Sequence, residues 1–185
     1  ARRDDGLGPS EFRGSGAEVR TAPFVMPGLV EAHCHVFLDG DELDFKMRSE
    51  YLKADVDAMD AVARRDLTSL AASGITLARD AGDKFGVNHR MRAETHGKGY
   101  SGPMLRSPGL GLRKPKRYGA FMARAVEGKD EIEAAVSELA ATADDIKIIL
   151  TGIIDFEAGA VTEPPQFDAD ELALIVAAAR EAGKP

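Results

Sequence analysis

Two histidines one residue apart are the strongest chemical signal in the sequence. His33 and His35 lie in the apolar run 27–36, PGLVEAHCHV. Side chains alternate across a β-strand, so Glu31 shares a face with both histidines and Cys34 lies on the other face. Two imidazoles that converge on one point suit a transition-metal ion such as zinc, and we expect a carboxylate such as Glu31 to support a ring nitrogen. The alternative is a surface strand with two incidental histidines.

A lysine in a strongly apolar segment is the second candidate. Residues 145–151, DIKIILT, form a predicted strand whose odd-numbered positions, Lys147 among them, face away from the helices. Burial is costly for an ammonium group and favours the neutral amine. A neutral amine reacts with carbon dioxide to give a carbamate, an anionic oxygen ligand that can bridge two cations. Alternatively, Lys147 forms a structural ion pair with Asp80 or Glu31, or lies at the open end of the strand.

The elements that would position these side chains alternate between strands and helices. Hydrophobic periodicity predicts strands at 24–36, 75–78, 103–106 and 145–151. It predicts helices at 55–73, at 88–94, after an N-cap at Asp130, and at 168–182 with Leu172, Ile175, Val176 and Ala179 facing the core. Four strands that are each followed by a helix indicate a parallel sheet, and four such units are half of an eight-stranded β/α barrel.

The composition is that of a folded domain without a nucleic-acid or membrane partner. The 185 residues are 44% hydrophobic and 30% charged, which is enough for a sizeable core. A net charge of -7 and a pI near 5.2 argue against a basic face for nucleic acid or anionic lipid. One cysteine and no long apolar segment argue against a disulfide framework and a membrane span, so we expect a cytoplasmic protein.

Three segments together resemble the amidohydrolase superfamily. Residues 25–35 resemble its first-strand signature, residues 74–82 its second-strand segment and residues 145–148 its fourth. The likeness is greatest to the branch with prolidase-like and imidazolonepropionase-like enzymes. It implies an α/β protein with a (β/α)8 TIM barrel of amidohydrolase type, of which the chain has only the first four or so β/α units.

This resemblance also implies a division of the chain. Residues 1–23 are then a loop or the remnant of a preceding β-sandwich, and residues 24–185 are the N-terminal half of the barrel. A half barrel exposes two apolar strand edges. We therefore expect a fragment that a C-terminal half completes, or a chain that associates with another copy as a homo-oligomer.

The resemblance assigns roles to individual residues. His33 and His35 would bind the more buried metal, and carboxylated Lys147 would bridge to a second, with zinc as the expected ion and one or two metals per full-length chain. Further histidines, and an aspartate that transfers a proton, are expected beyond Pro185. The sequence departs from the family pattern at Glu31, where aspartate is usual.

Several other residues are weaker candidates. Asp80 and Thr151 lie near strand ends and would bind substrate or support the ligands, although we favour for Asp80 a structural link to Arg79. A Gly-Gly-His element common after the third strand is replaced by PGLGLRKP at 108–115. The basic run at 113–117 would steer an anionic substrate or, as we favour, form a solvated loop.

The expected activity is hydrolysis of a small molecule. A water activated on a mono- or binuclear centre would cleave a C–N bond, as in an amide, a peptide-like compound or a cyclic amide, or an ester bond. A non-catalytic amidohydrolase-like scaffold is the alternative, and a generic phosphate-binding β/α barrel is a third interpretation. We expect Cys34 to be a packed small hydrophobe, and His89 and His96 to be surface residues.

Overall fold

The computed structural model describes residues 22–152, 159–160 and 163–185. The predicted loop or sandwich remnant at 1–23 therefore lies almost entirely outside the described residues. Within those that are described, no helix is both long and apolar enough to cross a lipid bilayer.

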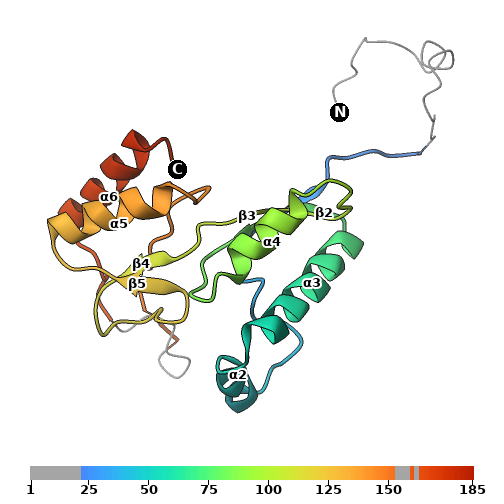
Figure 1. Ribbon diagram of the computed structural model, residues 1–185, viewed down its shortest axis with the longest axis horizontal. Helices are drawn as coiled ribbons and strands as arrows, with labels where there is room; N and C mark the ends of the chain where they lie inside the picture. The colour runs from blue at the N-terminus through green and yellow to red at the C-terminus, as the bar shows by residue number, and fades with distance from the viewer. Residues whose placement is uncertain (1–21, 153–158, 161–162) are drawn as a thin grey trace, which may run out of the picture.

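A three-stranded parallel sheet forms the first half of the structure. Its strands are β1 (Leu29–Cys34), β2 (Ile75–Asp80) and β3 (Met104–Arg106), in the order β1-β2-β3. Helix α3 (Val56–Ala72) leads into β2 and α4 (Val87–Thr95) into β3, while the short helix α2 (Phe45–Tyr51) precedes α3 (Figure 1). The predicted strand and helix order is confirmed here. Helix α2, in contrast, was not predicted.

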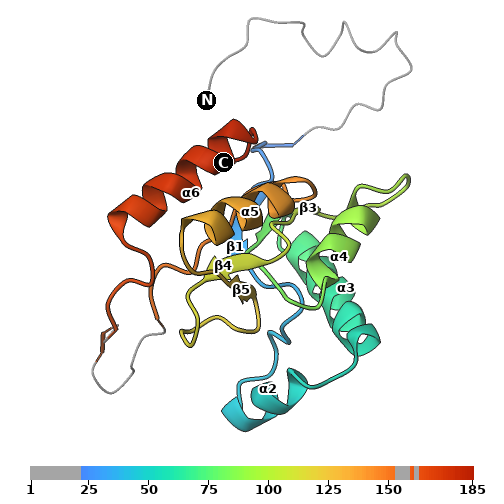
Figure 2. The ribbon, with the colours of Figure 1, turned by 60° about the vertical axis from the view of Figure 1, so that its left-hand side comes forward.

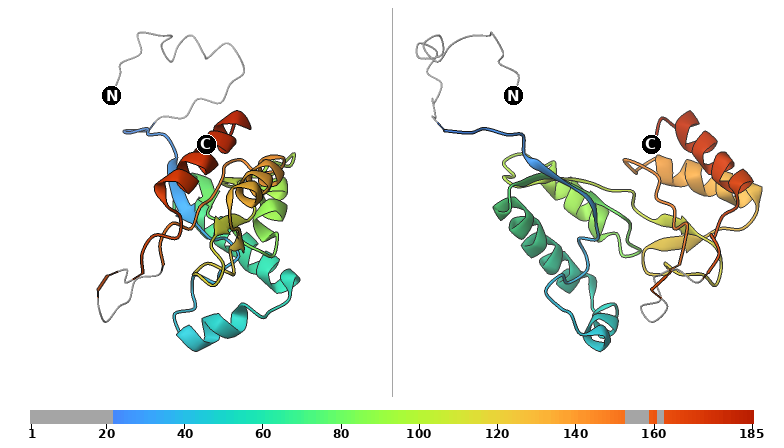
Figure 3. Two further views of the ribbon diagram at one scale, coloured as in Figure 1. Left: turned by 90° about the vertical axis from the view of Figure 1, so that its left-hand side faces the viewer. Right: turned by 180° about the vertical axis from the view of Figure 1, so that it is seen from behind.

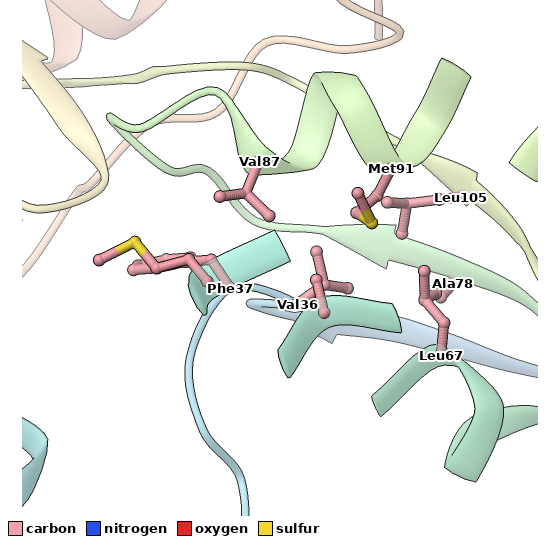
Figure 4. Close-up of a cluster of buried hydrophobic side chains, with 9 residues drawn as sticks. Val36, Phe37, Leu67, Ala78, Val87, Met91 and Leu105 are labelled. Atoms are coloured by element: carbon pink, nitrogen blue, oxygen red, sulfur yellow. The ribbon is translucent and has the colours of Figure 1, made fainter. Parts of the chain in front are cut away.

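Helices α3 and α4 and the sheet share one hydrophobic core. Asp55, the first residue of the predicted helix, is the N-cap of α3, because its side chain accepts a hydrogen bond from the backbone N–H of Ala58. Apolar side chains from β2, β3, both helices and the end of β1 point toward one another (Figure 4); the labelled ones are Val36, Phe37, Leu67, Ala78, Val87, Met91 and Leu105. Cys34 packs against this core, as predicted.

The second half of the structure has its own sheet and core. Strands β4 (Gly111–Arg113) and β5 (Ala123–Ala125) pair in parallel, and helices α5 (Lys129–Ala140) and α6 (Ala169–Glu181) lie side by side (Figures 1 and 2). Asp168 and Glu171 form a capping box at the start of α6. The buried apolar side chains here include Leu112, Val126, Ile132, Val136, Phe167 and Ile175.

The predicted strand at 145–151 is wrong as an extended strand. Its only bridge within the described residues joins Ile148 to Leu112 in parallel. On either side of this bridge the backbone pairs elsewhere: the N–H of Ile146 donates to the carbonyl of Pro185 at 3.0 Å, and the carbonyl of Leu150 accepts from the N–H of Gln166 at 2.6 Å. The side-chain pattern is nevertheless as predicted, since Ile146 and Ile148 pack against the core under α5 and α6.

Three smaller expectations are also corrected. Gly128, not Asp130, is the N-cap of α5, and Asp130 lies in the first turn, where its charge suits the helix dipole. Val176 is 41% exposed because it lies beside, not on, the buried stripe that Ile175 and Ala179 form. Strand β1 begins only at Leu29, and β4 and β5 were not predicted.

The two halves lie side by side and are joined by polar contacts (Figures 1 and 3). Arg92 of α4 pairs with Asp144 at 2.6 Å, and Asp144 also accepts from the backbone N–H of Ser107 at 2.9 Å. Arg79 of β2 pairs with Asp145 at 2.5 Å. These pairs fix the start of the 145–151 segment against the first sheet.

Candidate metal centre

A cavity of about 370 Å³ brings the predicted metal ligands together. The residues that line it are His33, His35, Tyr118, Met122, Lys147, Ile148, Ile149, Leu150, Thr151 and Gly152. Both histidines come from the end of β1 and Lys147 comes from the 145–151 segment, so one hollow joins parts of the chain that are far apart in sequence. Thr151 also lines the cavity, whereas Glu31 and Asp80 do not.

The end of β1 turns both imidazoles toward each other. The pairing with β2 is irregular between Glu31 and Cys34, where three steps of β1 span two steps of β2. The ring centroids of His33 and His35 lie 5.7 Å apart in an edge-on arrangement. Burial, with the nearby charge of Lys147, lowers the pKa of both rings and so favours their neutral, metal-binding form.

A backbone carbonyl fixes the tautomer of His35. Its Nδ1 lies 2.9 Å from the carbonyl oxygen of Gly82. A carbonyl can only accept, so Nδ1 carries the hydrogen and Nε2 keeps its lone pair in the neutral ring. Glu31, which we expected to support a ring, instead accepts from the backbone N–H of His33 at 2.8 Å.

Lys147 is half-buried and held by its backbone. The N–H of Leu112 donates to the Lys147 carbonyl at 2.8 Å, and the N–H of Ile149 donates to the Leu112 carbonyl at 2.8 Å. A Cβ at Gly111 would lie 3.0 Å from Cγ of Lys147, so glycine lets β4 approach the lysine stem. Burial, followed by the charge of Arg79, lowers the pKa of Lys147 and favours the neutral amine.

The alternative expected for Lys147, an ion pair with Asp80 or Glu31, is absent from the part of the chain that the structure describes. Asp145, two residues earlier, is occupied by Arg79, whose Nη2 and Nε donate to its two oxygens at 2.5 and 3.1 Å. We had expected Arg79 to be linked to Asp80. Its partner is instead Asp145. The Arg79 link therefore anchors the segment that carries the lysine.

Asp80 is a buried supporting residue that does not itself line the cavity. It is 0% exposed and accepts hydrogen bonds from the backbone N–H groups of Val36 and Gly82 and from the side chain of Asn88. Burial raises the pKa of its carboxyl to about 6. Its two oxygens accept three hydrogen bonds from the protein, which holds the carboxylate in place.

Cys34 lies on the helix side, as predicted, and is not a nucleophile. Its thiol donates to the carbonyl of Arg79 at 3.5 Å, and burial raises its pKa to about 12. The thiolate needed for reaction is therefore disfavoured.

The sequence did not mark Tyr118 and Met122 as cavity residues, nor Gln166, which holds Tyr118 and Thr151 in place. Tyr118 and Met122 form an aromatic and apolar wall from the segment between β4 and β5. The buried side chain of Gln166 donates to the carbonyls of Tyr118 and Thr151 at 3.2 Å each and accepts from the N–H of Lys114 at 2.9 Å. No local pattern marks these residues, because each acts through a partner distant in sequence.

Most cations of the basic run at 113–117 form contacts within the protein. Lys114 pairs with Glu171 and lies 5.2 Å from the ring centroid of Phe167. Arg117 pairs with Glu163 at 3.2 Å, and Arg113 donates to carbonyls of its own loop. Three of the four cations of the run thus hold the loop in place, while Lys116 is exposed.

The donor set fits part of a metal site. The described residues contain no group of three or more His, Cys, Asp or Glu side chains that could hold a metal ion. Two neutral imidazoles, one with its tautomer fixed, and a lysine face the same cavity. Nitrogen donors of this kind suit zinc and similar ions, and a carbamate on the lysine would add oxygen donors.

Comparison with solved structures defines the class of fold. A prolidase complexed with N-methylphosphonate-L-proline matches 86% of this chain at 23% identity and a TM-score of 0.67. A Xaa-Pro dipeptidase with bound methionine matches 85% at 23% identity and 0.65, and A. niger ochratoxinase matches 84% at 20% identity and 0.63. The chain spans only 40 to 41% of these proteins. Its parallel strands and helices are thus part of a TIM barrel of amidohydrolase type, which confirms the predicted fold class.

The family follows from the sequence itself. The profile of the Amidohydrolase family matches residues 24–185, so the chain belongs to this family. Members of the family generally use divalent metals. A search of curated proteins found no significant match.

Proposed function

We propose that the protein is a metal-dependent hydrolase of small molecules. The bond cleaved is a C–N bond, as in an amide, a peptide-like compound or a cyclic amide, or an ester bond. The observation that carries this proposal is that His33, His35 and Lys147 line one cavity, although Lys147 is more than a hundred residues away in sequence. Prolidase and Xaa-Pro dipeptidase among the similar structures support dipeptide-like amides as the first substrates to test.

In the proposed centre, His33 and His35 bind the metal through imidazole nitrogens. Lys147 adds its amine to carbon dioxide and loses one proton, which gives a carbamate that would serve as a bridging ligand. When bound, a divalent ion such as zinc polarises a carbonyl and lowers the pKa of a water molecule.

The surrounding residues position the ligands and shape the cavity. Gly82 orients the His35 ring, and the Arg79–Asp145 pair anchors the segment of Lys147. Tyr118 and Met122 provide an apolar wall against which a substrate group can exclude water.

The test is hydrolysis by the full-length protein on a panel of N-acyl amides, dipeptides, cyclic amides and esters. We expect activity that a chelator abolishes and added Zn²⁺ restores. His35→Asn and Lys147→Met should each be inactive, whereas His89→Asn, which changes a histidine outside the cavity, should be active. No turnover of any substrate by folded protein, in the presence of Zn²⁺, would favour the non-catalytic scaffold.

The carbamate has its own test. Protein equilibrated with 13C-labelled bicarbonate should show a carbamate carbon signal that is lost in Lys147→Met. Its absence in active, metal-loaded protein would show that Lys147 acts without carboxylation.

A further inference from the structure

The ring of His35 is oriented by one backbone carbonyl, and that carbonyl needs support of its own. Gly82, which provides it, follows the last residue of β2 by two positions and has φ +109. Few residues tolerate this conformation, and a glycine left unsupported could rotate its peptide away from the ring. The Gly82 carbonyl belongs to the peptide bond with Asp83, whose N–H donates to the carbonyl of Gly109 at 3.1 Å. The groups that hold Gly82 and Gly109 in place therefore decide whether Nδ1 of His35 keeps its acceptor.

The buried carboxylate of Asp80 accepts hydrogen bonds from the backbone on both sides of the His35–Gly82 contact. Oδ1 of Asp80 accepts from the N–H of Gly82 at 2.7 Å, and Oδ2 accepts from the N–H of Val36 at 2.9 Å. Val36 follows His35 directly. One side chain thus fixes the backbone beside the histidine and the residue that orients its ring.

Asn88 of α4 completes the arrangement. Its Nδ2 donates to Oδ1 of Asp80 and to the carbonyl of Gly109, both at 2.9 Å. It is 0% exposed, and Asp83 holds its backbone N–H at 2.7 Å. The side-chain amide of Asn88 therefore links Asp80 to the turn between β3 and β4 and holds the Asp80 carboxylate in its orientation.

We propose that Asp80 and Asn88 are positioning residues for His35, which set its tautomer and ring orientation through Gly82. This inference rests on the proposed function for its purpose, since an ordered Nε2 lone pair is what a metal requires. Partners that orient a metal-binding histidine typically change metal affinity by about 10- to 100-fold when they are lost. Asn88 acts through two further groups, so we expect about tenfold, the lower end of this range.

A second buried polar residue of α4, Thr95, provides a control that distinguishes a positioning role from a general effect on packing. Thr95 of α4 is 5% exposed, accepts from the N–H of Leu105 at 3.1 Å and donates to the Arg92 carbonyl. It ties α4 to β3 without touching Gly82 or Asp80. Thr95→Val is therefore a matched control for Asn88→Leu.

The experiment measures Zn²⁺ affinity and the His35 tautomer in the full-length protein. Affinity is measured by competition with a chelator, and the tautomer by 15N shifts of labelled histidine in metal-free protein. We expect Asn88→Leu to bind Zn²⁺ about tenfold more weakly. Its Nδ1 and Nε2 shifts should move toward each other as the tautomers mix, whereas Thr95→Val keeps wild-type affinity and shifts.

Two results would overturn the inference: folded Asn88→Leu with wild-type affinity and wild-type shifts, or an equal loss in Thr95→Val. If Asn88→Leu does not fold, Asn88→Ser, which leaves room for a water, is measured with the same outcomes. If wild-type protein binds no Zn²⁺, the proposed function fails, while the tautomer comparison still decides the inference.

Discussion

Gly82→Ala should be unusually destabilising, because two separate costs meet at this residue. Gly82 has φ +109, and an L-residue with positive φ costs about 1–2 kcal/mol. A Cβ there would also lie 2.8 Å from the backbone oxygen of Met122 and 3.4 Å from the nitrogen of Gly111. Overpacking against groups that cannot turn aside adds about 1–3 kcal/mol. The free energy of unfolding should therefore fall by about 2–5 kcal/mol.

Gly74→Ala is the matched control. Gly74 also has a positive φ, +82, but nothing lies within 4 Å of the position that a Cβ would take there. It should cost only the conformational part, about 1–2 kcal/mol. The assay is equilibrium urea unfolding of metal-free protein, with equal slopes required before midpoints are compared. If Gly82→Ala lowers the free energy of unfolding no more than Gly74→Ala does, the close approach of Gly82 to the Met122 carbonyl and to Gly111 is refuted.

Two further predictions concern charge. Asp145→Asn should lower the free energy of unfolding by about 1–2 kcal/mol, because it breaks a half-buried bidentate pair with Arg79. The control Glu138→Gln, which breaks an exposed pair with Arg124, should lower it by under about 0.5 kcal/mol. Equal losses for the two variants in urea unfolding would contradict this prediction. Burial, followed by the charge of Arg92, lowers the pKa of His89 below its ordinary value of 6.5. As the pH falls, the His89 ring is therefore protonated in the unfolded chain before it is protonated in the folded protein, so stability is lost below about pH 6.5. Unfolding curves of His89→Asn at a series of pH values should show a smaller acid loss, and an unchanged pH slope would count against the prediction.

The sequence predicted the elements that have strong local patterns. Helix α3 follows its apolar period between Asp55 and Ser73, and α6 follows its apolar period between Asp168 and Ala182. The ligand candidates were also predictable, because His-x-His and a lysine among isoleucines are local signals. That these side chains meet in one cavity could be expected only from the barrel, which the alternation of strands and helices and the family resemblance both indicate.

The rest depends on partners that no local pattern specifies. Residues 145–151 make one bridge to β4, because the neighbouring backbone groups of Ile146 and Leu150 pair with Pro185 and Gln166 instead. The acceptor for His35 is the Gly82 carbonyl, and any residue type has a carbonyl, so side-chain chemistry pointed wrongly to Glu31. The partner of Arg79 is Asp145, 66 positions away, and not its neighbour Asp80.

The central claim is that His33, His35 and Lys147 bind metal together, and metal content tests it most directly. Full-length protein is purified after growth with Zn²⁺, and metal per chain is measured by mass spectrometry. We expect one or two divalent ions per chain in the wild type and in His89→Asn, with a loss of at least one in His35→Asn. Wild-type protein that is folded and metal-free, or His35→Asn with its full metal content, would contradict it.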